Sequence, residues 1–189
     1  GFSSIRHTIT PGQVESSGFS GMNDFTIQDQ YTWENAVFTS WDKTVTDRLS
    51  VNVGLRVSGL SVLGKGEFYT FDSEGEVTST TSRGNGAIVN TYINQEPRLS
   101  FSYLLDEFSS VKGSYARMTQ NMHLLSNSTS GNPTDRWIGT SNIIKPEIGD
   151  QVSGGYFRKL KDGAYEVSGE VYYKWMQNQI DYRNGADIL

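Results

Sequence analysis

The feature that most constrains the fold is a long alternation of side chains near the C-terminus, over residues 165–175. Successive side chains of a β-strand point to opposite faces, so a period of two predicts a strand. An Asp-Gly pair at 162–163 supplies residues that take positive φ in a tight hairpin turn. We therefore predict a hairpin over residues 149–178. One face of its second arm carries Tyr165, Val167, Gly169, Val171, Tyr173 and Trp175, and the other carries Glu166, Ser168, Glu170 and Lys174.

The predicted arms are unusually long. Strands of globular proteins have about five or six residues, whereas each of these arms has roughly eleven or twelve. About ten residues of alternating hydrophobicity, with aromatic residues near the ends, are typical of a transmembrane β-strand. Long amphipathic strands also build soluble β-sandwiches, so both architectures stay open at this point.

Two more hairpins are predicted, over residues 31–58 and 97–118. In the first, a polar turn at 42–47 precedes an arm whose face of Leu49, Val51, Val53, Leu55 and Val57 is wholly aliphatic. In the second, a turn at 106–109 joins arms that share one apolar face. That face consists of Leu99, Phe101, Tyr103 and Leu105 on the first arm, and Val111, Gly113 and Tyr115 on the second.

The remaining segments are irregular and rich in Gly, Ser and Thr. Residues 1–30 are predicted to be loop with a short edge strand or two, and residues 59–96 and 119–148 to be long loops. Two short strands near 67–71 and 87–93 are possible within the first of these loops. The whole chain, 1–189, is therefore a single all-β region, an antiparallel meander of long hairpins. Short turns at one end and long loops at the other are typical of outer-membrane barrels, whose long loops are extracellular.

Composition narrows the function. A mean hydropathy of -0.48 is too low for a helical membrane protein, but a β-barrel exposes only alternate residues to lipid. The 16 Lys and Arg residues are scattered and the net charge is -5, which argues against nucleic-acid binding. Without cysteine there are no disulfides or thiolate metal ligands. The two histidines, His7 and His123, are expected to be ordinary surface or loop residues, so we expect no catalytic site, no metal and no cofactor.

Three segments, in order along the chain, carry a resemblance to a known family. The first hairpin ends in Gly-Leu-Arg at 54–56. The second contains Glu-Pro-Arg-Leu at 96–99 and Ser-Tyr-Ala-Arg at 114–117, and the third contains Lys-Pro-Glu at 145–147 and Val-Tyr-Tyr-Lys at 171–174. Together, over residues 31–181, they resemble the β-barrel of TonB-dependent outer-membrane receptors, especially transporters of the Bacteroides type.

This resemblance implies a barrel-wall and extracellular-loop segment of a transporter in the bacterial outer membrane, which imports a large or scarce nutrient. The implied partners are outer-membrane lipid, the energy-coupling TonB protein acting through a plug region, and a small-molecule, glycan or metal-chelate substrate. Nothing in the chain resembles the plug, and three or four hairpins do not close a plugged barrel of about 22 strands. We therefore expect a fragment of the transmembrane β-barrel.

Three aromatic residues in the predicted loops are candidates for ligand binding: Tyr69, Tyr92 and Trp137. Exposed aromatic rings can stack on a sugar or another ligand, although they can also pack the loops onto the barrel rim. Two other architectures stay open. One is a soluble secreted β-sandwich that binds carbohydrate or a partner protein and buries the aliphatic face of residues 49–57, and the other is a small complete barrel of about eight strands.

Overall fold

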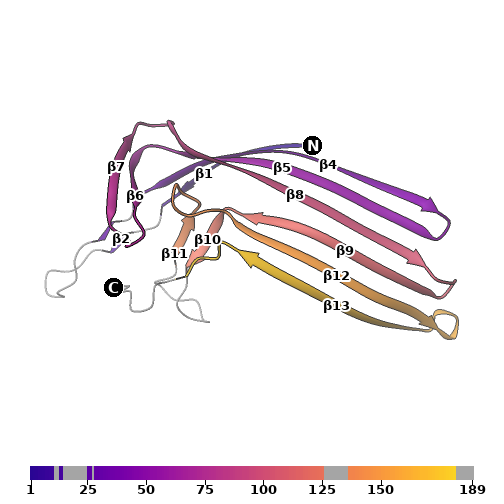
Figure 1. The fold of residues 1–189 in the computed structure, drawn as a ribbon. Helices are drawn as coiled ribbons and strands as arrows, with labels where there is room; N and C mark the ends of the chain where they lie inside the picture. Colours follow the sequence, from indigo (N-terminus) through magenta and orange to yellow (C-terminus); the bar gives the residue numbers. More distant parts are fainter. Residues whose placement is uncertain (11–12, 15–24, 27, 126–135, 182–189) are drawn as a thin grey trace.

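A seven-stranded antiparallel sheet forms most of the molecule in the computed structural model, which describes residues 1–10, 13–14, 25–26, 28–125 and 136–181. The sheet is a meander with the strand order β1-β4-β5-β8-β9-β12-β13 (Figure 1). Its members are β1 (Phe2–Ile9), β4 (Gln30–Thr46), β5 (Leu49–Leu63), β8 (Ile88–Leu104), β9 (Ser109–Gln120), β12 (Glu147–Leu160) and β13 (Tyr165–Gln177).

Three short hairpins branch from this sheet. They pair β2 (Gln13–Val14) with β3 (Phe25–Thr26), β6 (Gly66–Phe71) with β7 (Val77–Arg83), and β10 (Met122–Leu125) with β11 (Arg136–Gly139). Figure 1 shows them at one end of the sheet, here called the loop end, while the turns β4–β5, β8–β9 and β12–β13 lie at the opposite turn end. No helix in the described part of the chain is long and apolar enough to cross a membrane. The fold is thus all-β, as predicted.

The register places apolar residues side by side across the sheet. Direct cross-strand partners share a face, and one row of partners crosses six strands. We call the face that contains this row the apolar face, and the opposite one the polar face. The row consists of Trp41, Val53, Leu99, Tyr115, Val152 and Tyr173. The aliphatic arm at 49–57 and the shared face of the second hairpin therefore lie where the alternation predicted.

The apolar face has no second sheet packed on it within the described part of the chain. Val171 is 75% exposed, and Trp41, Leu55 and Phe101 are also exposed. Buried apolar side chains are few among the described residues and gather at the loop end: Ile9, Ala36, Leu60, Val62 and Leu63. The β-sandwich that would bury residues 49–57 is therefore wrong. The small complete barrel is wrong as well, because the described strands form an open sheet with β1 and β13 at its edges.

The turns and loops differ from the predicted boundaries. The polar run at 42–47 is not a turn: β4 continues to Thr46 and β5 begins at Leu49. The Thr46 side-chain hydroxyl accepts hydrogen bonds from the backbone N–H groups of Arg48 and Leu49. These bonds stabilise the turn between β4 and β5. At the loop end, β5 extends to Leu63 and β8 begins at Ile88, so the first long loop is shorter than 59–96. The polar residues at 42–46 continue β4, because this part of the strand does not carry a continuous apolar face.

Candidate functional site

The polar face at the loop end is covered by the β10–β11 hairpin. Two side-chain contacts hold it against the sheet: Asn121 donates to Glu34 Oε2 at 3.0 Å, and Gln30 Oε1 accepts from the Gly139 N–H at 2.7 Å. A Cβ at position 139 would lie 2.7 Å from Cδ1 of Ile9, so a larger residue there would have to displace the tip of that side chain. The hairpin therefore sits directly on the strands that carry the buried residues of this end.

Charged side chains form a network beside this hairpin. Arg56 Nη2 donates to Glu34 Oε1 at 2.9 Å, and Arg56 Nε lies 3.7 Å from the carboxylate of Glu96. Arg98 lies 3.7 Å from the second oxygen of Glu96. The network lines a groove of about 460 Å³ that reaches from β1 to β10 across the polar face. These residues alternate with the apolar positions of β4, β5 and β8, so Arg56 lies on the polar side as a barrel requires.

A second hollow lies nearer the turn end of the same face. It has a volume of about 660 Å³. Its floor is made of short polar side chains in one cross-strand row, Asn52, Ser100, Ser114 and Ser153, of which the last two share a hydrogen bond of 2.7 Å. Because these side chains are small, they leave space above the sheet that polar groups from another segment or molecule can occupy.

The segment at 141–144 ties the two long loops together. Tyr92 Oη donates to the carbonyl of Ser141 at 2.8 Å, and Asn142 Nδ2 donates to the carbonyl of Tyr69 at 2.7 Å. The Ser141 hydroxyl also accepts the N–H groups of Ile143 and Ile144 and so shapes the segment. Residues of β6, β8 and the chain after β11 are therefore held in one cluster at the loop end.

Two of the three predicted ligand-binding residues, Tyr69 and Tyr92, belong to this cluster, and the third, Trp137, lies on β11. Tyr92 uses its hydroxyl to hold the loop and is partly buried. Tyr69 is exposed and donates its hydroxyl to Glu67 at 2.9 Å. Trp137 is 53% exposed and lies across β10–β11 from Leu124, which is also exposed. The rings of Tyr69 and Trp137 are therefore accessible to a ligand, whereas Tyr92 holds the segment at 141–144 in place.

Sequence reasoning missed the charged network of Glu34, Arg56, Glu96 and Asn121. Glu34 and Asn121 are 87 positions apart, and nothing local pairs them. The sequence signal that could have pointed to this network is that Arg56, Glu96 and Arg98 occur within two of the motifs that carry the family resemblance.

His123 is buried, contrary to the expectation of an ordinary surface or loop residue. Its side chain is 2% exposed, and neither ring nitrogen has a hydrogen-bond partner among the described residues. Its Nδ1 is 3.7 Å from Glu147 Oε2, which is too long for a hydrogen bond. Burial lowers the pKa of His123, and the nearby Glu147 carboxylate only partly opposes this effect. The folded state therefore favours a neutral imidazole on the buried side of β10.

Acidification is expected to loosen the β10–β11 hairpin. A base whose pKa is lowered on folding binds fewer protons in the folded state, so stability falls as the pH drops below the ordinary histidine value of about 6.5. The protection factors of the β10 amides, which correct for the slower base-catalysed exchange at low pH, should be smaller at pH 5.5 than at pH 7.5. His123→Asn should remove most of this pH dependence and His7→Asn should leave it. Equal dependence in both variants would assign the effect to another group.

An ion pair stands on the apolar face near the loop end. Asp150 on β12 is fully buried and accepts two hydrogen bonds from Arg117 on β9, from Nε at 2.8 Å and Nη2 at 3.0 Å. Tyr115 Oη donates to the same carboxylate at 2.6 Å. The Asp150–Arg117 pair lies two residues beyond the Val152–Tyr115 pair, toward the loop end.

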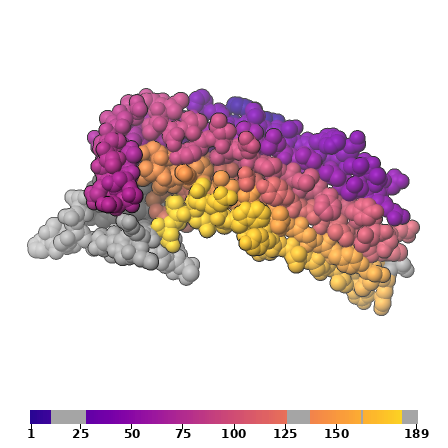
Figure 2. All heavy atoms as spheres, viewed as in Figure 1, coloured from indigo at the N-terminus to yellow at the C-terminus, as the bar shows by residue number. Residues whose placement is uncertain are grey.

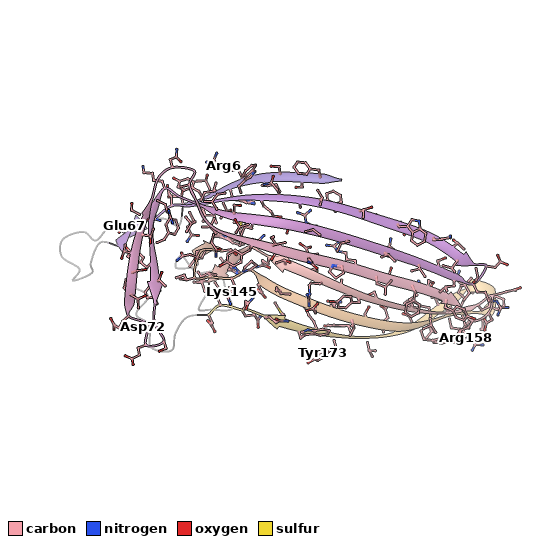
Figure 3. All side chains as sticks on the ribbon, turned by 45° about the horizontal axis from the view of Figure 1, so that its top comes forward. Arg6, Glu67, Asp72, Lys145, Arg158 and Tyr173 are labelled. Atoms are coloured by element: carbon pink, nitrogen blue, oxygen red, sulfur yellow. The ribbon has the colours of Figure 1, made fainter. Side chains whose placement is uncertain are left out.

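Aromatic side chains occur at both ends of that apolar band. Tyr103, Tyr156 and Tyr165 lie toward the turn end, Trp33 and Trp175 lie toward the loop end, and Trp41 and Tyr173 belong to the cross-strand row between them. Figure 3 shows side chains standing out on both faces of the curved sheet, with Tyr173 among them. An exposed apolar band with aromatic borders, over a polar opposite face, is the surface pattern of an outer-membrane barrel.

A family model described as TonB dependent receptor-like, beta-barrel, matches residues 4–189. The chain belongs to this family. TonB-dependent receptors are transporters of the bacterial outer membrane and not enzymes, and they interact with TonB and with the substrates they carry. The chain is thus a barrel segment of an outer-membrane transporter. No curated protein and no solved structure matches it.

Proposed function

We propose that this segment supplies barrel wall and part of the extracellular mouth to a TonB-dependent transporter of the Bacteroides type, which imports a large or scarce nutrient. The apolar face contacts outer-membrane lipid, and the loop end faces outward. The nutrient is a small molecule, a glycan or a metal chelate. TonB drives its uptake through a plug that fills the lumen beside the polar face.

The observation that carries this proposal is the cluster at the loop end. Tyr92, Ser141 and Asn142 connect β8 and β6 to the segment after β11, Tyr69 keeps an accessible ring in that cluster, and Trp137 keeps one on β11. Rings that are held by a fixed framework lose little freedom when a ligand stacks on them, which favours capture. The charged groove beneath β10–β11 offers polar contacts to a ligand that has entered the mouth.

Removal of the accessible rings tests the proposal. In cells that make the intact transporter, Tyr69→Ala and Trp137→Ala should each weaken binding of the transported probe about tenfold, since one stacked ring contributes about 1.4 kcal/mol. Maltoheptaose, cobalamin and ferric citrate serve as one probe for each substrate class. Loss of TonB should abolish uptake and leave binding unchanged.

Tyr172→Ala is the matched control. Tyr172 is highly exposed on the polar face of β13, away from the loop cluster. Its replacement should leave binding and the amount of protein in the outer membrane unchanged. If both ring variants bind every transported probe as tightly as the parent does, the loop cluster is not the capture site.

A further inference from the structure

The β6–β7 hairpin stands apart from the seven-stranded sheet. Figure 1 shows it at the loop end, turned away from the direction of the long strands, and Figure 2 shows it as a column that is uncovered on the viewed side. All seven side chains of β7 are exposed. A two-stranded sheet of this size is only marginally stable in water unless something packs against it.

The two outer edges of this hairpin differ. On β6, the Glu67 N–H donates to Gln28 Oε1 at 3.0 Å, and the Tyr69 carbonyl accepts from Asn142 Nδ2 at 2.7 Å. Two of the outward groups of that edge are thereby satisfied by side-chain amides. Gln28 also fills the space beside Gly66, where a Cβ would collide with its amide.

Within the part of the chain that the structure describes, the β7 edge has no such partners. Glu67 and Tyr69 pair with Ser82 and Thr80, and their own backbone groups point away from β7. In an antiparallel ladder, both members of such a pair point outward, so the N–H and C=O groups of Thr80 and Ser82 face away from β6. Among the described residues none forms a hydrogen bond with them. The β6 edge is therefore partly capped by side chains, whereas the β7 edge is open.

The open edge lacks the usual protection against pairing with another chain. Residues 77–83 read Val-Thr-Ser-Thr-Thr-Ser-Arg, with β-branched residues, no proline and no charge except Arg83. Its flat, extended backbone can accept an added strand, and the main-chain hydrogen bonds of such an addition are available only to a polypeptide. A sugar or metal chelate has no matching row of amides.

The side chains around this edge indicate the composition of the added strand. Tyr69, Phe71 and Val77 are exposed on the hairpin. Glu67, Asp72, Glu74 and Glu76 outnumber Lys65 and Arg83 in the same segment. Figure 3 places Glu67 toward the base of the hairpin and Asp72 at its tip. The Asp72 carboxylate accepts the N–H groups of Glu74 and Glu76, which lowers its pKa and keeps it charged at neutral pH.

We propose that the open edge of β7 binds an extended peptide that carries lysine or arginine beside apolar residues, and that such peptides are the substrate class captured at the loop end. This inference rests on the proposed function, because it assigns a substrate to the same mouth. The peptide adds a third strand to the hairpin, its cationic side chains face the acidic residues, and its apolar side chains pack beside Tyr69 and Phe71.

Binding to the intact transporter tests the open edge. The probe is a fluorescent decapeptide of alternating Lys, Val and Thr, and its binding is measured by anisotropy in detergent. Methylation of every backbone amide of the peptide should weaken binding at least tenfold, because it removes the pairing N–H groups. Replacement of its lysines by glutamates should have a similar effect.

Variants of the transporter provide the complementary experiment. Thr80→Pro removes one outward N–H at an edge position that tolerates proline, and it should also weaken binding at least tenfold. Thr80→Val keeps the N–H and should bind as the parent does. The amount of folded protein in the outer membrane is measured for both variants, and the methylated peptide gives the same answer if Thr80→Pro does not assemble.

The outcomes separate this inference from the proposed function. If the lysine peptide does not bind, or binds Thr80→Pro and the parent equally, the inference is wrong. The capture role would then still stand wherever Tyr69→Ala and Trp137→Ala weaken binding of a transported probe. If Thr80→Pro instead dissociates a dimer of the transporter, a second copy occupies the edge and the peptide assignment is wrong.

Discussion

Replacement of Val53 by lysine is expected to keep most of the protein out of the outer membrane. Val53 is the middle residue of the aliphatic run at 49–57 on β5, and it lies between Trp41 and Leu99 in the cross-strand row of the apolar face. A lysine at the lipid-facing midplane of a transmembrane barrel costs about 2–4 kcal/mol. That penalty is a large part of the stability of an ordinary fold, so the amount of folded protein recovered from the outer membrane should fall several-fold.

Asn52→Lys is the matched control, because Asn52 is the next residue on the same strand and faces the polar side. It should assemble nearly as well as the parent. Folded protein is quantified by its resistance to unfolding in detergent without heating. Equal recovery of both variants would mean that the apolar face is not in contact with lipid, and a soluble Val53→Lys protein would contradict the barrel placement of β5.

Removal of the Asp150 carboxylate is expected to destabilise the protein by about 3 kcal/mol, the lower end of the cost of breaking a buried ion pair. Asp150→Ala leaves the Arg117 guanidinium and the Tyr115 hydroxyl without the acceptor they share. The low end applies because the Arg117 side chain is 38% exposed, so that the pair is only partly enclosed by protein. Urea unfolding of the intact protein in phospholipid vesicles gives the change in free energy of unfolding.

A double-mutant cycle isolates the ion pair from other effects of these substitutions. Arg117→Ala removes the cation and leaves Asp150 buried with one remaining donor, so it should also be destabilising. The double variant should lose less than the sum of the two single losses. Strictly additive losses would show that the two side chains stabilise the protein independently and that their hydrogen bonds contribute little.

The alternation of residues was sufficient to predict the long strands and their two faces. It placed Leu49, Val53 and Val57 on one side and Arg56 on the other, because the side-chain period of a strand is fixed by backbone geometry. It misplaced the first turn, since Asp42, Lys43 and Thr44 are polar residues that continue β4. Polar runs predict turns in soluble proteins, but a barrel strand can remain polar where it leaves the lipid.

The candidate site was predictable only in part. Tyr69 and Trp137 could be named as candidates because aromatic residues are conspicuous in Gly-rich and Ser-rich segments, and their ligand-binding role stays a prediction. The structural role of Tyr92 was not predictable, because its partner Ser141 is 49 positions away. The network of Glu34, Arg56 and Glu96 depends on the register of three strands, and the burial of His123 depends on how a hairpin folds back onto the sheet. Neither is encoded in a local pattern.

The length of the strands has a geometric consequence for access to the mouth. β4 and β8 each have 17 residues, which span about 56 Å at 3.3 Å per residue. At a tilt of about 45°, they rise about 40 Å, whereas the apolar band of an outer-membrane barrel is about 25 Å tall. The excess forms a collar of hydrogen-bonded sheet above the bilayer. A molecule arriving from outside would thus meet protein well before it meets lipid headgroups.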